Sequence, residues 1–257
     1  MRVPTRVWRG VGRFGRVRDA AVIVALLSVA SAQTWSPIAR THRKVLVVDI
    51  GGTSVKVLAT AQEPSRSCPS GPTLTPARMV SAVKAMTGDW TYDVVAIGYP
   101  GAVKRGAPIA EPRNLAGGWV GFDFAAAFGR PVKVLNDAAM QALGSYRGGT
   151  LLFVGLGTGL GSAVIVDGTV LPMELGGLAY KDATYEDYLG IRGLQRLGQP
   201  EWEHDIGDLV ARLVQDLRPD DVVLGGGNVE KLRALPAGSR AGSYANAFAG
   251  GFRLWQQ

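Results

Sequence analysis

The chain has a single cysteine, Cys68, among its 257 residues. One thiol cannot form an internal disulfide framework or a cysteine zinc site, and it is compatible with a reducing compartment. A long apolar run is also missing. The stretch from Ala20 to Ala32, AAVIVALLSVASA, has 13 residues, which is too short to predict a membrane span. The composition therefore excludes a disulfide-stabilised scaffold and argues against a membrane protein.

A basic surface is missing from most of the chain, although the net charge is +7. Residues 1–44 hold nine Lys and Arg and one acid, Asp19, whereas residues 45–257 hold 19 basic and 20 acidic residues. The excess of positive charge therefore belongs to the N-terminal extension. The rest of the chain shows no sign of a nucleic-acid-binding surface.

The extension resembles a secretory signal, because residues 1–18 carry six Arg and no acid ahead of the apolar stretch. That stretch closes on Ala30-Ser31-Ala32, a small-residue cleavage box. The long charged region and Asp19 argue against export. Three explanations stay open, in this order: a start codon assigned too far upstream, a signal or short anchor, and an organelle transit peptide. We place residues 1–43 outside the fold as disordered or signal-like, and expect a cytoplasmic protein.

The stretch VLVVDIGGTSVKV, Val45 to Val57, predicts a strand, a tight turn and a second strand. The apolar run ends at Asp49, and Gly51 and Gly52 allow positive φ and leave backbone N–H groups uncovered. Thr53 adds a hydroxyl. Such a turn can hold a phosphate against backbone amides, although it can equally be an ordinary hairpin between core strands.

A second glycine-rich stretch, GLGTGLGSAVIVDG, covers residues 155–168. The dinucleotide-binding fingerprint needs a third glycine where Leu160 stands, and it needs a helix to follow. Here an apolar strand follows, so the stretch predicts a glycine hairpin around Thr158. Because it repeats the layout of the first hairpin, we predict a duplicated architecture.

Two further strands end in polar or glycine-rich residues. Val132–Leu135 leads into Asn136-Asp137 and a helix, which places an amide and a carboxylate where open α/β sheets bind ligands. A helix N-cap explains the same pair. The strand at residues 222–224 leads into Gly225–Gly227, and a helix start around Val229 to Leu232 would favour an anionic group.

Three other polar residues are candidates for sugar contacts. Asn114 precedes Gly117-Gly118-Trp119, where an amide beside an aromatic ring suits a sugar, although Trp119 can equally be core packing. Glu174 and Glu186 could accept hydrogen bonds from sugar hydroxyls or could be solvated acids.

In order and spacing, these pieces resemble the ROK family of sugar kinases, within the actin/hexokinase-like ATPase superfamily. The resemblance runs from about Lys44 to Trp255 and is similar to the polyphosphate/ATP glucokinase branch. It is carried by the motifs DIGGTSVKV (49–57), GYPG (98–101), NL near GGW (114–119), VLNDAAMQALG (134–144), GLGTGLGSAVIVDG (155–168), ELGG (174–177) and VVLGGG (222–227).

The resemblance implies an α/β, two-lobed actin-like ATPase (ribonuclease H-like) fold with a cleft between the lobes. We expect an N-terminal lobe at residues 44–147 and a C-terminal lobe at 148–257, whose last helix could return to the N-terminal lobe. It also implies a sugar substrate, Mg²⁺, and ATP or polyphosphate as phosphoryl donor. Whether the protein forms a homodimer stays open.

The resemblance further implies roles for particular residues. Asp137 matches the catalytic base, which accepts the sugar hydroxyl proton, and Asp49 matches the acid near the Mg²⁺–phosphate group. The positions that match sugar-binding residues are Asn114, Asn136, Glu174 and Glu186. The remaining nucleotide- and phosphate-binding positions are Gly51, Gly52, Thr53, Lys56, Gly157, Thr158, Gly159, Gly161, Gly225, Gly226 and Gly227.

The sequence departs from the family pattern in two places. Gly177 stands where the family's E-x-G-H motif has His, which removes a sugar contact and, in many members, a zinc ligand. The cysteine-rich zinc motif is also absent, so no metal-ligand site for zinc is expected. No helix-turn-helix precedes Val45, which argues against the family's repressor role.

The leading hypothesis is therefore a hexokinase/glucokinase-type phosphotransferase that acts on a hexose, with glucose first. A non-catalytic sugar-binding ROK protein is the alternative, although the presence of Asp137 argues against it. An actin-like ATPase comes third, because the Asn-Asp pair and two further acids favour a small-substrate pocket.

Overall fold

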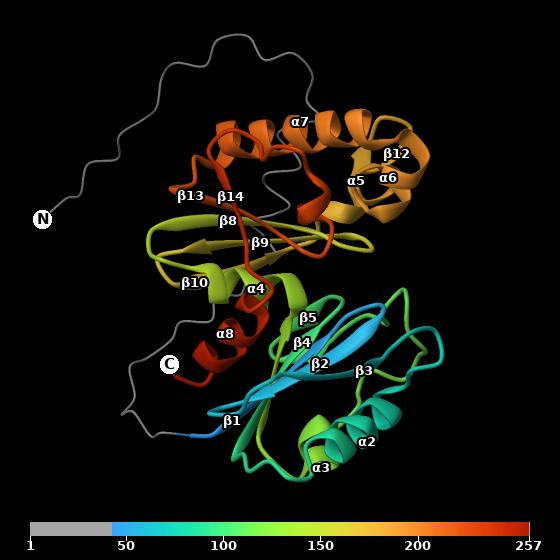
Figure 1. The fold of residues 1–257 in the computed structure, drawn as a ribbon, viewed down its shortest axis with the longest axis vertical. Helices are drawn as coiled ribbons and strands as arrows, with labels where there is room; N and C mark the ends of the chain where they lie inside the picture. Colours follow the sequence, from blue (N-terminus) through green and yellow to red (C-terminus); the bar gives the residue numbers. More distant parts are fainter. Residues whose placement is uncertain (1–42, 257) are drawn as a thin grey trace, which may run out of the picture. The chain divides into compact units, whose positions relative to one another are not determined.

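The computed structural model describes residues 43–256. The predictions made for the N-terminal extension lie outside the described residues. Within them, two five-stranded sheets share one strand arrangement: three antiparallel strands joined to two parallel ones (Figure 1).

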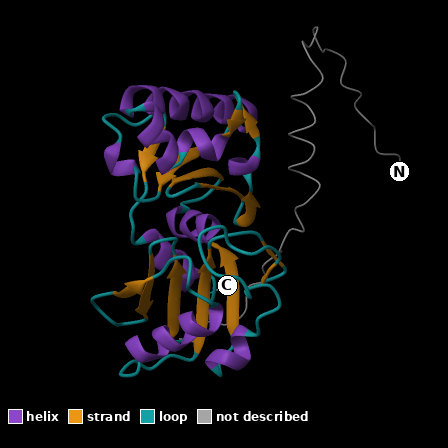
Figure 2. Cartoon of the chain, turned by 90° about the vertical axis from the view of Figure 1, so that its right-hand side faces the viewer, coloured by secondary structure: helices purple, strands orange, loops and turns teal. Residues whose placement is uncertain are grey.

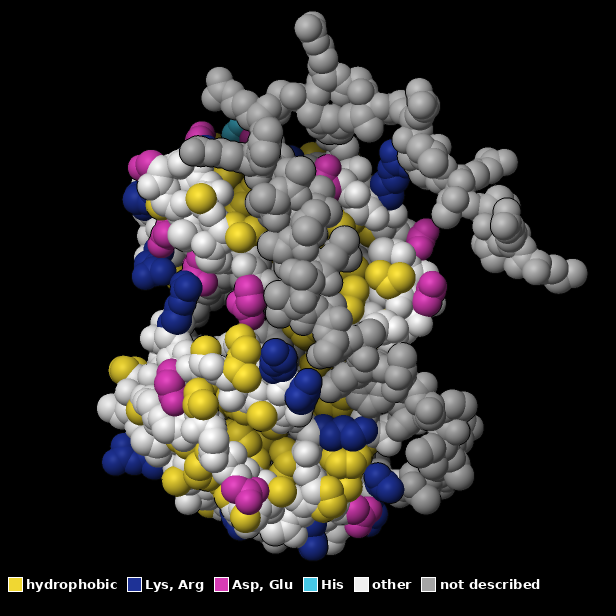
Figure 3. All heavy atoms as spheres, turned by 180° about the vertical axis from the view of Figure 1, so that it is seen from behind, with side chains coloured by type: hydrophobic (Ala, Val, Ile, Leu, Met, Phe, Trp, Pro, Cys, Tyr) yellow, Lys and Arg dark blue, Asp and Glu magenta, His cyan; other side chains and the backbone are white. Residues whose placement is uncertain are grey.

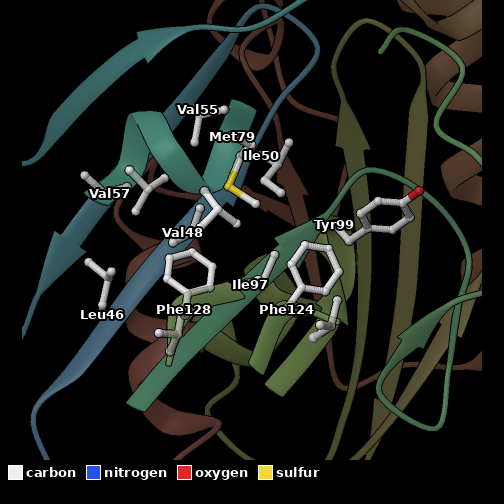
Figure 4. Close-up of a cluster of buried hydrophobic side chains, with 14 of the residues drawn as sticks. Leu46, Val48, Ile50, Val55, Val57, Met79, Ile97, Tyr99, Phe124 and Phe128 are labelled. Carbon is white, nitrogen blue, oxygen red and sulfur yellow. The ribbon is translucent and has the colours of Figure 1, made fainter. Parts of the chain in front are cut away.

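The N-terminal sheet has the strand order β3-β2-β1-β4-β7. Alternate residues of β1 and β2 point to opposite faces, and the face formed by Leu46, Val48 and Ile50 is buried. Figure 4 shows Met79, Phe124 and Phe128 packed over this face. The elements of this part are β1 (Val45–Ile50), β2 (Ser54–Ala59), β3 (Arg66–Pro69), α2 (Pro76–Met86), β4 (Val94–Tyr99), β5 (Val103–Lys104), β6 (Ala107–Pro108), α3 (Phe124–Phe128) and β7 (Val132–Asn136).

Helix α2 begins where its sequence predicts. The Thr75 side chain accepts a hydrogen bond from the backbone N–H of Arg78, and Pro76 occupies the first turn, where its missing N–H costs nothing.

The C-terminal sheet repeats this order as β10-β9-β8-β13-β14, which bears out the predicted duplication. Figures 1 and 2 show the long helix α7 along one face of this sheet. The elements of this part are α4 (Asp137–Ser145), β8 (Thr150–Leu156), β9 (Leu160–Val166), β10 (Thr169–Met173), η1 (Leu175–Gly177), β11 (Ala179–Tyr180), β12 (Ala183–Thr184), α5 (Tyr185–Leu189), α6 (Ile191–Leu197), α7 (Gln199–Leu217), β13 (Asp221–Gly225), η2 (Val229–Lys231), β14 (Ser239–Ala241) and α8 (Asn246–Arg253).

Helices α4 and α8 pack together and share one buried cluster with strands of both sheets. Their crossing is close enough to require glycine. A Cβ on Gly144 would lie 1.9 Å from the carbonyl oxygen of Asn246, and a Cβ on Gly250 would lie 1.8 Å from that of Met140. Just beyond α8, the Trp255 indole donates to the carbonyl of Val95 in β4 at 3.1 Å. The end of the chain therefore contacts the N-terminal sheet.

One expectation needs correction, and one open alternative is decided. The helix expected after Gly227 is only η2, a three-residue 3₁₀ turn, so it has too little aligned dipole to attract an anion. Trp119 is fully buried beside Tyr99 and Phe124, and its indole donates to the carbonyl of Ala116 at 2.6 Å. Its ring therefore belongs to the core and is closed to a sugar.

Within residues 43–256, no helix has both the length and the apolar character needed to cross a membrane. Figure 3 shows one face of the molecule, on which acidic and basic side chains are interspersed wherever grey atoms do not cover it.

Candidate active site

The carboxyl ends of three parallel strands bring the predicted acids together. Asp49 of β1 lies beside Gly98 of β4, and Tyr99 of β4 lies beside Asn136 at the end of β7. A Cβ on Gly98 would lie 3.3 Å from Asp49 Oδ1 and 2.4 Å from the terminal methyl of Met140. Glycine at position 98 therefore lets β4 pass close to both Asp49 and helix α4.

Asn136 and Asp137 divide two tasks that the sequence left ambiguous. Asn136 is the N-cap of α4: its Oδ1 accepts from the N–H of Ala139 at 3.0 Å, and its Nδ2 donates to the carbonyl of Gly101 at 3.1 Å. Asp137, the first residue of the helix, accepts short-range hydrogen bonds from backbone N–H groups, that of Ala138 at 2.8 Å and its own. No side chain within residues 43–256 donates to this carboxylate.

The electrostatics of the two acids suit proton transfer. Burial raises the pKa of Asp137 to about 7, with further increases from the charges of Asp49 and Glu174 against a lowering by the Ala138 hydrogen bond. Burial also raises the pKa of Asp49 to about 6, against the lowering effect of Lys56. A general base works best with a pKa near the working pH, which is where Asp137 stands.

The first two glycine turns meet, as a shared phosphate site would require. A Cβ on Gly52 would lie 3.5 Å from the Thr158 hydroxyl and 3.7 Å from the Cβ of Asn114. Neither Gly51 nor Gly52 has a positive φ, contrary to the conformational argument from sequence. What they supply is close approach, because a Cβ on Gly51 would lie 3.1 Å from the carbonyl oxygen of Ser54.

The third glycine turn packs against the second. Gly226 has φ +84°, and a Cβ there would lie 2.4 Å from the carbonyl oxygen of Leu156. Asn228 fixes the same contact, because its Nδ2 donates to the carbonyl of Gly157 at 2.7 Å. Gly225 is also close-packed, since a Cβ there would lie 2.4 Å from the Phe153 ring, whereas Gly227 is open.

Lys56 lies across from Asp49 in the antiparallel β1–β2 pair. Its ammonium group lies 3.6 Å from the centroid of the Tyr244 ring, and desolvation lowers its pKa against the effect of Asp49. Thr53 is exposed at the tip of the same hairpin. Tyr244 was not a predicted site residue, and no local motif marks it.

The two glutamates lie in one segment, from the start of η1 to α5. Glu174 precedes η1, and burial raises its pKa, with Arg113 lowering it and Glu186 raising it. Glu186 Oε1 accepts from Arg113 at 2.9 Å and from Arg192 at 3.4 Å. Neither arginine was predicted, although Arg113 directly precedes the candidate Asn114.

Gly177, the position that departs from the family motif, is exposed, and a Cβ there would meet no atom within 4 Å. A larger side chain therefore has room at this position.

Among the described residues, no group of three His, Cys, Asp or Glu side chains is placed to hold a metal ion. Magnesium does not require one, because it is usually held by one or two carboxylates together with substrate phosphates and water. Asp49 supplies hard carboxylate oxygens and fits that requirement, and a divalent cation beside it would offset the charge that raises the pKa of Asp137.

A surface hollow lined by Lys44, Trp90, Asp93 and Arg130 lies elsewhere. These residues flank the amino-terminal ends of β1, β4 and β7, whereas the acids lie at the carboxyl ends. We therefore assign no catalytic role to this hollow.

The repeated sheets, with paired acids and glycine turns at the strand ends, define a two-lobed α/β protein of the actin-like ATPase class. Solved structures agree. The polyphosphate/ATP-glucomannokinase of Arthrobacter sp. strain KM superimposes with a TM-score of 0.70 at 24% identity, over 81% of this chain and 96% of that one. A ROK family glucokinase from Streptomyces griseus, in complex with glucose and AMPPNP, gives 0.67 at 19% identity, over 82% and 98%.

The sequence profile of the ROK family matches residues 45–176, and the chain belongs to the ROK family. A polyphosphate glucokinase of Mycobacterium tuberculosis is 25% identical over 227 residues, covering 79% of this chain and 84% of the relative. The resemblance found from motifs, including the polyphosphate glucokinase branch, is confirmed. Family and relatives together support a sugar kinase.

The raised pKa of Asp137 predicts how stability depends on pH. The folded chain holds this proton up to about pH 7, whereas an unfolded aspartate releases it near about pH 3.9. The folded state therefore binds more protons between these values, and stability falls as pH rises from about 4 to about 7. Asp137→Asn removes this loss, so at pH 8 the variant should be more stable than the wild type by on the order of 4 kcal/mol.

Urea unfolding at pH 5 and pH 8 measures this difference. Asp123→Asn is the matched control, because Asp123 also begins a helix, as the N-cap of α3, and Asn caps equally well. Equal pH dependence in the wild type and Asp137→Asn would contradict the assignment.

Proposed function

We propose that the protein is a sugar kinase that transfers the terminal phosphoryl group of ATP or polyphosphate to a hexose hydroxyl, with glucose the first candidate. The observation that carries this proposal is the placement of Asp137. Its half-buried carboxylate has a pKa raised to about 7 and lies beside Asn136, next to the acid of the first glycine turn. The names of the relatives support the choice of sugar and donors.

Asp137 would accept the proton of the attacking hydroxyl. The sugar oxygen then forms a bond to the terminal phosphorus, and the bond from that phosphorus to the bridging oxygen breaks in line. The leaving group is ADP or a polyphosphate shortened by one unit. The products are a sugar phosphate and a proton, which Asp137 returns to solvent.

Asparagine and glutamate side chains would position the sugar. Asn136 is held by its hydrogen bonds to Ala139 and Gly101, so its orientation is fixed before substrate arrives. Asn114 lies beside the meeting point of the two glycine hairpins, and Glu174 and Glu186 lie in the segment that follows β10. Sugar hydroxyls can donate to both carboxylates.

The donor phosphates would lie against the glycine turns. The N–H of Gly51 already donates to the carbonyl of Ser54, and that of Gly157 to the carbonyl of Gly159, so the anion would meet the remaining N–H groups of these turns, and Lys56 adds a positive charge. Asp49 would hold Mg²⁺, which offsets charge on the transferring group, and Asp137 would remain free to accept the hydroxyl proton. Gly225, Gly226 and Gly227 would complete this side of the site.

The test is a panel of hexoses offered with ATP and with polyphosphate, in the presence of Mg²⁺, with sugar phosphate measured directly. Turnover of glucose with at least one donor is the expected result. Absence of a phosphorylated product from every pair, with either donor, would overturn the kinase proposal.

A non-catalytic sugar-binding protein is the second candidate. It is weakened by the absence of a side chain at Gly177, where a sugar contact of the family is missing, and the presence of Asp137 argues against it. Calorimetric binding of a sugar without turnover by either donor would select this alternative. An actin-like ATPase would hydrolyse ATP without a sugar requirement.

Four statements stay predictions: the lobe boundary near residues 147 and 148, the cytoplasmic location, the homodimer and the absence of nucleic-acid partners.

A further inference from the structure

Arg113 and Glu186 form an ion pair between segments that are 73 positions apart in the chain. Arg113 lies in the irregular segment between β6 and α3, next to Asn114, and Glu186 lies in α5. Arg113 Nη1 lies 2.9 Å from Glu186 Oε1. The Glu186 side chain is only 17% exposed, against 68% for the Arg113 side chain. The arginine thus reaches from the surface to a largely enclosed carboxylate.

The two oxygens of Glu186 have different surroundings. Oε1 accepts from Arg113 and, at 3.4 Å, from Arg192. Oε2 faces two glycines, because a Cβ on Gly159 would lie 2.6 Å from it and a Cβ on Gly176 would lie 3.3 Å from it. A side chain at Gly159 would therefore displace this oxygen and one at Gly176 would crowd it, and no protein donor to Oε2 is found within residues 43–256.

The charges around Glu186 show why two arginines are not equivalent. Arg192 lies in α6, close along the chain, and has a second partner, Asp187, at 3.7 Å. Arg113 comes from the other segment, and Glu186 is its ion-pair partner in the described structure. Arg113 also affects Glu174, whose pKa its charge lowers. Arg113 therefore links Asn114 with both candidate sugar carboxylates.

We propose that Arg113 is a positioning residue for the sugar: it binds Oε1 of Glu186 and so presents Oε2 to a sugar hydroxyl. This rests on the proposed function. A carboxylate can accept several hydrogen bonds, so the ion pair does not prevent Glu186 from accepting one from a sugar. Because Asn114 follows Arg113 directly, the pair also sets the separation of two sugar contacts that come from different segments.

The expected effect is on sugar binding and not on phosphoryl transfer. A partly exposed ion pair contributes little energy, so Arg113→Ala should raise the sugar KM by about fivefold and leave kcat and the donor KM within about twofold. Arg113→Lys keeps the charge but loses the planar fork, and should recover part of the loss. Arg192→Ala, the matched control, should raise the sugar KM by less than about twofold.

Steady-state kinetics on the full chain, with sugar and donor varied separately, provide this test, and thermal unfolding checks that each variant folds. Equal effects of Arg113→Ala and Arg192→Ala, an unchanged sugar KM in Arg113→Ala, or a fall in kcat with unchanged KM would each overturn the positioning role while leaving the kinase proposal intact. A wild-type chain that neither binds nor phosphorylates any sugar would overturn both.

Discussion

Asp137→Asn should lower kcat by about 10²- to 10⁴-fold, the usual contribution of a general base. The amide has nearly the shape of the carboxylate but cannot accept the hydroxyl proton. Asn136 should continue to cap α4 through Ala139, so the helix and the sugar contacts are expected to persist. The sugar KM should therefore change far less than kcat. The measurement is the rate of sugar phosphate formation with the better of the two donors.

The control for this prediction is Asp123→Asn, which replaces another acid at a helix start, where the side chain caps α3 through the N–H of Ala126 at 2.9 Å. Its kcat should equal that of the wild type. Equal turnover by Asp137→Asn would remove Asp137 from the chemistry, although the sugar kinase proposal would survive.

Gly144→Ala should destabilise the protein by about 3 kcal/mol or more, because overpacking a tight contact costs about 1–3 kcal/mol and occasionally more. The new methyl would lie 1.9 Å from the carbonyl oxygen of Asn246 and 2.8 Å from the backbone nitrogen of Gly250. Both are backbone atoms, so no side chain can rotate away. Helix α4 would have to move from α8, and Asp137 at its start would move with it.

Gly207→Ala is the matched control in the same urea-unfolding experiment. Gly207 also lies inside a helix, α7, but a Cβ there would meet no atom within 4 Å. Alanine should stabilise this helix by up to about 1 kcal/mol. If Gly144→Ala stabilised the protein as Gly207→Ala does, the result would contradict the close packing of α4 against α8.

The local signals in the sequence predicted much of the architecture. Alternating apolar residues and glycine turns predicted both hairpins, and Thr75-Pro76 predicted the start of α2. The order of the motifs predicted the family. Such features depend on neighbours within a few positions, which is why they can be read from the chain alone.

The tertiary structure decided what those local signals left ambiguous. Asn136 and Asp137 both suit a helix start, and only the structure shows that Asn136 caps the helix through the N–H of Ala139 and that Asp137 has its pKa raised by burial beside Asp49. In place of the helix expected after Gly227 the structure has a single 3₁₀ turn, and Trp119 lies in the core.

The sequence by itself determined the family, the two hairpins and the identity of the acids, because each is recorded in short patterns. The tertiary structure alone decided the Arg113–Glu186 pair, the glycine contact of α4 with α8 and the meeting of Gly52 with Thr158. Each joins residues separated by about 70 to 110 positions. Burial, desolvation and close packing between such residues depend on the complete fold, so no local pattern in the sequence specifies them.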